Sequence, residues 1–240
     1  MPNQMKETLQ EELPFRSRGG KRRGAGRTRR GPRRGVSHRQ RPGLSRRHPV
    51  HVTLRVVPEV GRLRRRSCYR VVREALVTSR ERQLDRFRVC HVSIQGNHLH
   101  LLVEAEDRQA LSRGMQGLAI SCAKGINRTL SERTGVRRRG RVFADRYHAE
   151  ILEHPQRVRH CLAYVLNNWR RHREDVEHRW RVDPFSSGRT FNGWADATTP
   201  WVQIRDGEEL LMVWFPRTWL LAESWKRHGS ISPWERPGPK

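Results

Sequence analysis

The first clear pattern along the chain is an alternation of apolar and polar residues that begins at His51. It predicts a half-buried strand with two unlike faces. The apolar face consists of Val52, Leu54 and Val56, and the polar face of His51, Thr53 and Arg55.

The elements that follow can be read in the same way. Residues 67–84 have apolar side chains near helical spacing, and residues 108–133 carry the clearest amphipathic helical pattern, which Gly135 ends. Between these helices, residues 87–94 and 98–104 predict two strands joined by a turn at 95–97. A fourth strand is expected near 142–152, and a helix from Pro155 to about Arg173.

The predicted order is therefore β-α-β-β-α-β-α. It indicates an α+β fold: a ferredoxin-like βαββαβ sheet with two helices on one face and an added C-terminal helix that bears Tyr164. We expect the other face of the sheet to be left open for function.

The charge of the chain adds a prediction about its binding partner. The chain has 50 Lys and Arg against 24 Asp and Glu, a formal charge of +26, which makes nucleic acid the expected partner. Residues 16–47 hold fourteen Lys and Arg, seven Gly and no acidic residue, so we expect residues 1–47 to be a disordered basic arm. The arm can act as a phosphate clamp without sequence preference or as a solubilising tail.

The sequence disfavours a membrane protein, a secreted protein and a fold held by zinc or disulfides. No long apolar run and no signal peptide is present, so we expect a cytoplasmic, nucleoid-associated protein that does not enter a membrane. The four cysteines form no C-x-x-C pair, so we expect buried thiols rather than a zinc ribbon or disulfides.

We assign residues 48–176 to a catalytic domain and residues 177–240 to a tryptophan-rich extension. With Trp169, the extension contains all eight tryptophans, which can pack on the core or stack on bases. Packing is the interpretation we favour.

Two histidines stand out in the third predicted strand. Alternation places His98 and His100 on one face, opposite Leu99 and Leu101, where two imidazoles can bind one divalent metal ion. By itself, a His-x-His in a strand also fits two surface histidines or half of an unrelated metal site. Glu104, on the same face, can support the metal ligands or be an exposed charge at the strand end.

The helix after Pro155 supports the metal site. Its apolar stripe is separate from a polar face that carries Tyr164 and Asn168, which are neighbours at i and i+4. A packing role for Tyr164 is therefore disfavoured. If this face lies over the sheet, Asn168 can add an oxygen ligand and Tyr164 can reach a bound phosphate. We expect Arg55, Arg157 and Arg171, on these two polar faces, to contact DNA.

Taken together, three segments resemble the REP-associated tyrosine transposases, a branch of the single-tyrosine HUH transposases. They are His98-Leu99-His100 after Gly96-Asn97, residues 141–147, and Tyr164-Val165-Leu166-Asn167-Asn168. The resemblance covers roughly residues 48–190 and departs from the family at Gly96 and Trp169, where the family often has proline.

The resemblance implies that His98, His100 and Asn168 bind the metal, Mg²⁺ or Mn²⁺, and that Tyr164 is the nucleophile. It implies cleavage and rejoining of single-stranded or hairpin DNA through a 5′-phosphotyrosine. The first alternative is a non-catalytic binder of structured single strands. A rolling-circle initiator or relaxase has less support, since no second tyrosine lies near Tyr164. The sequence leaves the oligomeric state and the DNA sequence recognised open.

Overall fold

The computed structural model describes residues 41–82, 85–176, 180–195 and 209–238. The predicted order of elements is confirmed. Strand β1 (Val50–Arg55) is followed by helix α1 (Arg66–Arg82), strands β2 (Phe87–Ile94) and β3 (His98–Ala105), and helix α2 (Arg108–Thr134). Strand β4 (His148–Ile151) and helix α3 (Pro155–Arg171) complete the series, and a short helix, α4 (Trp219–Ala222), lies further along.

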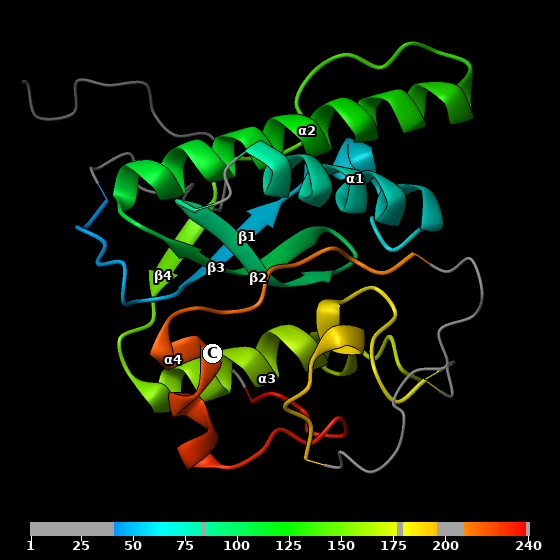
Figure 1. The fold of residues 1–240 in the computed structure, drawn as a ribbon. Coiled ribbons are helices and arrows are strands. Elements are labelled where there is room, and N and C mark those ends of the chain that lie inside the picture. The colour runs from blue at the N-terminus through cyan, green and yellow to red at the C-terminus, as the bar shows by residue number, and fades with distance from the viewer. Residues whose placement is uncertain (1–40, 83–84, 177–179, 196–208, 239–240) are drawn as a thin grey trace, which may run out of the picture. The chain divides into compact units, whose positions relative to one another are not determined.

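The four strands form one antiparallel sheet in the order β2-β3-β1-β4. Strand β3 is therefore central, as a His-x-His site on a sheet face requires. Between Val89 and His91 the pairing of β2 with β3 shifts by one residue. Helices α1 and α2 cover one face of the sheet, where the apolar side of each strand forms the larger core (Figure 1).

Local chemistry explains the ends of two helices, and Gly135 and Pro155 lie at the ends predicted from the sequence. Asp107 caps α2 by accepting a hydrogen bond from the Ala110 backbone N–H at 2.7 Å, and Gly135 ends it with a left-handed φ of 68°. Helix α3 begins with Pro155 at its first turn, where the missing N–H costs nothing. It continues through Trp169 without a break.

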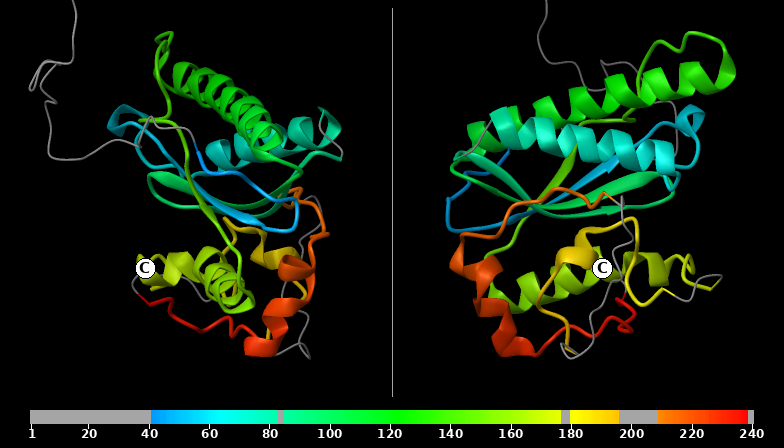
Figure 2. Two further views of the ribbon diagram at one scale, coloured as in Figure 1. Left: turned by 90° about the vertical axis from the view of Figure 1, so that its left-hand side faces the viewer. Right: turned by 45° about the vertical axis from the view of Figure 1, so that its right-hand side comes forward.

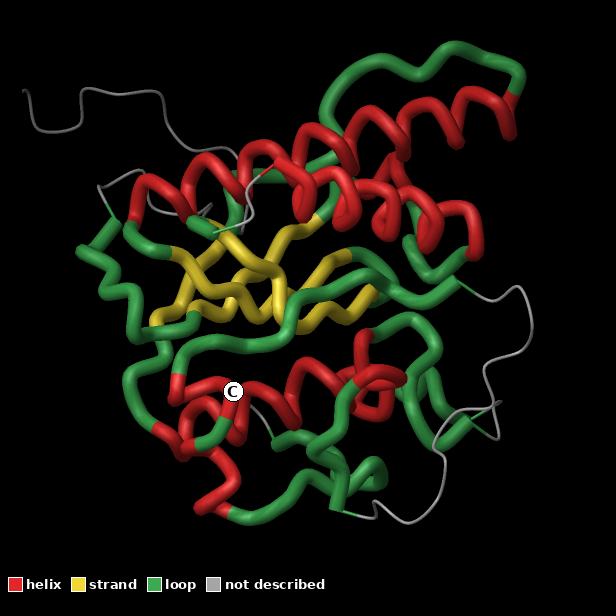
Figure 3. Tube along the Cα trace, viewed as in Figure 1, coloured by secondary structure: helices red, strands yellow, loops and turns green. Residues whose placement is uncertain are grey.

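The second face of the sheet is covered, so the expectation of an open face is wrong. Helix α3 and the segment after it lie on that face (Figure 1), and Figures 2 and 3 show the same layering from other sides and by element type. The reason is that this face is not wholly polar: Cys90 and Leu102 are buried there in a second core with the apolar stripe of α3.

The tryptophan-rich extension completes this second core. It contributes Val182, Phe191, Trp194, Leu220, Leu221, Trp225 and Ile231. Trp169, Trp194 and Trp225 are buried, whereas Trp180, Trp219 and Trp234 are 40–57% exposed. Packing is therefore confirmed for three of the tryptophans. The three exposed rings leave aromatic surface for a partner.

Strand β4 is shorter than expected, because residues 142–147 form a turn and a single bridge from Phe143 to Val56. All four cysteines are free and buried, as predicted, and burial raises the pKa of Cys122 to about 12.

Most of the expected basic arm lies outside the described residues. At the end of the arm, the Arg41 guanidinium packs on the Tyr147 ring, 3.6 Å from its centroid. No described helix has the length and apolarity needed to cross a bilayer.

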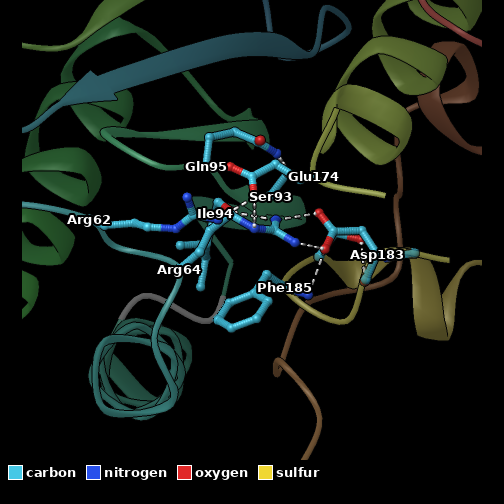
Figure 4. Close-up of polar contacts among 10 residues, drawn as sticks. Arg62, Arg64, Ser93, Ile94, Gln95, Glu174, Asp183 and Phe185 are labelled. Atoms are coloured by element: carbon cyan, nitrogen blue, oxygen red, sulfur yellow. Dashed lines mark hydrogen bonds and ion pairs between the residues drawn. The ribbon is translucent and has the colours of Figure 1, made fainter. Parts of the chain in front are cut away.

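A buried ion pair ties the extension to the core (Figure 4). Arg64 donates two hydrogen bonds to the carboxylate of Asp183, at 2.8 and 2.9 Å, and a third to the Ile94 carbonyl at 3.0 Å. The Asp183 side chain is fully buried, and this desolvation raises its pKa against the opposing effect of Arg64.

We expect Arg64→Ala to destabilise the protein strongly, because it leaves a buried carboxylate without its partner. Such losses are typically about 3–5 kcal/mol. Urea unfolding followed by circular dichroism measures this change. The matched control is Arg128→Ala, since Arg128 and Glu74 form an ion pair in which both side chains are more than half exposed. Equal stability of the two variants would show that the buried pair does not hold the extension.

Candidate active site

The site begins with the two histidines of β3. His98 and His100 lie opposite Arg55 and Thr53 of β1, on the sheet face that α3 covers. Their ring centroids are 4.5 Å apart and the rings are nearly perpendicular. The alternation of the strand therefore brings the two imidazoles together on one face, as the sequence predicted. His100 is buried and His98 is partly exposed.

Helix α3 brings Tyr164 to these histidines. The centroid of its ring is 5.2 Å from that of His100 and 5.9 Å from that of His51, edge-on in both cases. Tyr164 is partly buried, and it also lines a hollow of about 450 Å³ with Glu150, Arg157 and His160. The phenol thus borders both the histidines and a space that is open to solvent.

Asn168 lies one turn after Tyr164, and His172 one turn further. Because Tyr164 packs on His100 and His172 on His98, with centroids 5.8 Å apart, Asn168 lies between them on the helix face directed at the two histidines. Asn168 is fully buried, yet neither its amide oxygen nor its amide nitrogen has a hydrogen-bond partner among the described residues. A buried polar group of this kind calls for a ligand, because leaving it unpaired costs free energy.

The environment keeps His98 uncharged. Burial lowers the pKa of His98 to about 4, and the Coulombic effects of the nearby His172, Arg55 and His51 act in the same direction. A neutral imidazole is the form that binds a metal ion. Two imidazoles and one amide oxygen form a donor set suited to a divalent ion that also binds phosphate and water. Among the described residues, no group of three or more His, Cys, Asp or Glu side chains is placed to hold a metal.

Residues 51–168, which span the sheet and α3 as far as Asn168, match the family model described as "Transposase IS200 like". The chain belongs to the IS200-like transposases. The family predicted from the two histidines and the tyrosine helix is therefore confirmed, and with it the general expectation of an enzyme that binds and cleaves DNA. Enzymes of this family generally use a divalent metal ion.

No curated protein matches this transposase. Among solved structures, it is similar to a REP-associated tyrosine transposase bound to a REP hairpin, with 15% identity and a TM-score of 0.46 over 74% of this chain and 100% of that chain.

The three arginines expected to contact DNA surround the transposase site. Arg55 lies at the end of β1, opposite His98. Arg171 lies 5.8 Å from the centroid of the Tyr164 ring, and Arg157 pairs with Glu150 at the edge of the hollow beside Tyr164. All three are exposed. Their guanidinium groups therefore place positive charge around the histidines and Tyr164.

Both interpretations of Glu104 are wrong. Glu104 is buried, not an exposed charge, and its hydrogen bonds tie it to the extension rather than to the histidines. Its carboxylate accepts hydrogen bonds from the Thr218 backbone and hydroxyl, both at 2.8 Å, and from the Arg217 backbone. It also pairs with Arg88 at 3.0 Å. Glu104 therefore holds the start of α4 on the sheet.

The sequence reasoning missed His51 and His172. The signal for His51 was present, because the alternation of β1 already placed it on the polar face with Thr53 and Arg55. What was missing was the register of β1 against β3, which makes His51 the diagonal neighbour of His100. His172 follows the last residue of α3, two turns beyond Tyr164, and helical spacing could have found it.

Burial also shapes the pH dependence of stability. His91 is buried on the same sheet face, and desolvation lowers its pKa to about 4. Because the folded state disfavours a proton that the unfolded state accepts, the free energy of unfolding should fall as the pH drops from about 6.5 towards 4. We expect His91→Leu to flatten this fall by up to about 1.4 kcal/mol per pH unit. Urea titrations at a series of pH values measure it, and an unchanged slope would contradict the assignment.

Proposed function

We propose that this protein cleaves and rejoins single-stranded DNA through a covalent 5′-phosphotyrosine on Tyr164. The observation that carries the proposal is the contact of Tyr164 with His100, one of the two histidines of the His-x-His pair, inside an IS200-like transposase domain. His98, His100 and Asn168 would hold a divalent ion, Mg²⁺ or Mn²⁺. When bound, such an ion polarises the scissile phosphate and fixes its orientation.

The residues of the chain carry out the remaining steps. The Tyr164 oxygen forms a bond to phosphorus as the bond from phosphorus to the 3′ oxygen breaks. The phenol gives up its proton, and the 3′ oxygen leaves as a hydroxyl group. The phosphotyrosine conserves the energy of the broken bond, so rejoining is the reverse reaction. Arg55, Arg157 and Arg171 would bind flanking phosphates and keep the strand in place.

We further propose hairpin DNA of the REP type as the substrate, in keeping with the resemblance. Exposed Trp180, Trp219 and Trp234 offer rings on which unpaired bases can stack. The same rings, together with the burial of His100, favour the second candidate, a non-catalytic binder of structured single strands. That candidate needs charge and stacking but no reactive tyrosine.

One experiment separates the two candidates. The full chain is incubated with a pool of 3′-end-labelled hairpins carrying single-stranded flanks, with Mn²⁺, and the products are run under denaturing conditions. An enzyme yields a labelled band at the mass of a protein–DNA adduct, and chelation of the metal removes it. A binder that retards hairpins on a native gel without forming any adduct would contradict the proposal.

The basic arm should supply affinity rather than catalysis. We expect removal of residues 1–40 to weaken binding to any single strand and to flatten the dependence of log K on log salt. The slope should fall by about 0.7 for each phosphate that the arm neutralises. Truncation before Arg41 keeps the packing of Arg41 on Tyr147. Fluorescence anisotropy over a salt series measures the slope. Loss of cleavage at saturating DNA in a folded truncated protein would place the arm in the active site.

A further inference from the structure

Three side chains from three strands form a row across the sheet beneath Tyr164. Glu150 of β4 lies opposite His51 of β1, and His100 of β3 is the diagonal neighbour of His51. The Nε2 atom of His51 is 3.1 Å from Nδ1 of His100, and Nδ1 of His51 is 3.9 Å from a carboxylate oxygen of Glu150. The rings of His51 and His100 are stacked, with centroids 5.2 Å apart.

The direction of the hydrogen bond in this row matters for chemistry. A neutral imidazole carries one N–H and one acceptor nitrogen, and its partners decide which is which. The carboxylate of Glu150 can only accept, so its charge favours the proton of His51 on Nδ1, the nitrogen that faces it. At 3.9 Å this effect is electrostatic rather than a direct hydrogen bond.

The protonation of His51 in turn decides which ring nitrogen of His100 carries the proton. With its proton on Nδ1, His51 presents Nε2 as an acceptor, so His100 must donate from its own Nδ1. The lone pair of His100 is then on Nε2, the nitrogen left for a metal ion. Thr53 also contacts Nδ1 of His100, at 3.2 Å, but a hydroxyl donates or accepts equally well and imposes no direction.

We propose that His51, oriented by Glu150, is a positioning residue that fixes the tautomer of His100 in the metal-binding form. This inference rests on the proposed function, because it gives His100 the role of a metal ligand. His51 does not touch the substrate in this arrangement. Only 1% of its side chain is exposed, so solvent does not compete for the hydrogen bond. The other oxygen of Glu150 is bound by Arg157, which holds the carboxylate in the row.

The row also explains how the fold tolerates two buried imidazoles. Rings buried face to face have few other ways to satisfy their nitrogens, and buried polar groups without partners destabilise a protein. The hydrogen bond between the two rings pairs Nε2 of His51 with Nδ1 of His100, and the partly exposed carboxylate of Glu150 stabilises the buried Nδ1 of His51 electrostatically. Partners of this kind typically strengthen metal binding by about 10–100-fold.

Nuclear magnetic resonance tests the inference directly, without metal and without cleavage. In the full chain labelled with ¹⁵N-histidine, long-range ¹H–¹⁵N correlations show which ring nitrogen of each histidine carries the proton. We expect His100 at pH 7.5 to carry it on Nδ1. His51→Leu should abolish this preference and weaken Mn²⁺ binding about 10–100-fold by titration calorimetry. His51→Gln should restore both, because its amide oxygen can accept from Nδ1–H.

Two further variants sharpen the test. Glu150→Gln, which leaves the buried rings intact, should reduce the Nδ1–H preference of His100, whereas Thr53→Val should keep it. A proton on Nε2 of His100 in the parent protein, or an unchanged tautomer in both His51→Leu and Glu150→Gln, would overturn the inference. If instead the parent binds no Mn²⁺ and forms no adduct, the proposed function fails, and the tautomer measurement still decides the positioning role of His51.

Discussion

His100→Ala is expected to abolish DNA cleavage while leaving the protein folded and able to bind hairpins. His100 packs against Tyr164, and the other imidazole of the His-x-His pair, His98, is partly exposed. Without His100 the site keeps at most one imidazole of that pair and the Asn168 oxygen, too few ligands to hold a metal ion tightly. A phenol is a weak nucleophile unless the phosphate it attacks is polarised.

The measurement is single-turnover cleavage of a labelled hairpin at saturating protein, with calorimetry of Mn²⁺ binding alongside. We expect a fall in rate of about a hundred- to a thousandfold, the scale seen when electrostatic stabilisation of a transition state is lost. His148→Ala is the matched control, since His148 lies on the same sheet face but on the edge strand β4, and it is exposed. Its cleavage rate should be close to that of the parent protein. Cleavage by His100→Ala at the parent rate would exclude the metal site.

Tyr164→Phe has the second large effect. It removes one oxygen and keeps the ring that packs edge-on against His51 and His100. Folding, metal binding and hairpin binding should therefore match the parent protein to within about one hydrogen bond. Formation of the covalent adduct should cease. If Tyr164 served only as a packing or stacking ring, phenylalanine would serve equally and activity would survive.

The other two tyrosines provide the controls. Tyr147 is buried beneath Arg41, and the hydroxyl of Tyr69 donates a hydrogen bond to the Glu209 carbonyl at 2.9 Å. Both rings pack with the larger core, on the sheet face opposite to Tyr164. Tyr147→Phe and Tyr69→Phe should both form the adduct. Absence of the adduct in one of these variants would indicate that the substituted tyrosine, and not Tyr164, is the nucleophile.

The sequence was informative wherever a residue's role depends on local periodicity. Alternation in β3 brought His98 and His100 to one face, and helical spacing in α3 brought Tyr164 and Asn168 to another, because both patterns repeat within a few residues. Helix ends at Asp107, Gly135 and Pro155 follow from chemistry that is equally local.

The sequence failed where contacts join distant segments. The row of Glu150, His51 and His100 depends on the register of β1 against β3 and β4, which periodicity does not specify. The covering of the second sheet face depends on single anchors, Asp183 with Arg64 and Glu104 with Thr218, in an extension that has no regular repeat. A buried carboxylate and an exposed one look the same in a sequence.

The central claim is that Tyr164 becomes joined to DNA. It is tested most directly by trapping the adduct of the full chain with a hairpin and Mn²⁺, digesting protein and DNA, and finding by mass spectrometry which peptide carries the nucleotide. Our account predicts a phosphotyrosine bond to the new 5′ end made by the cut, within the peptide from α3 that contains Tyr164. A nucleotide on any other residue, or the same adduct formed by Tyr164→Phe, would contradict it.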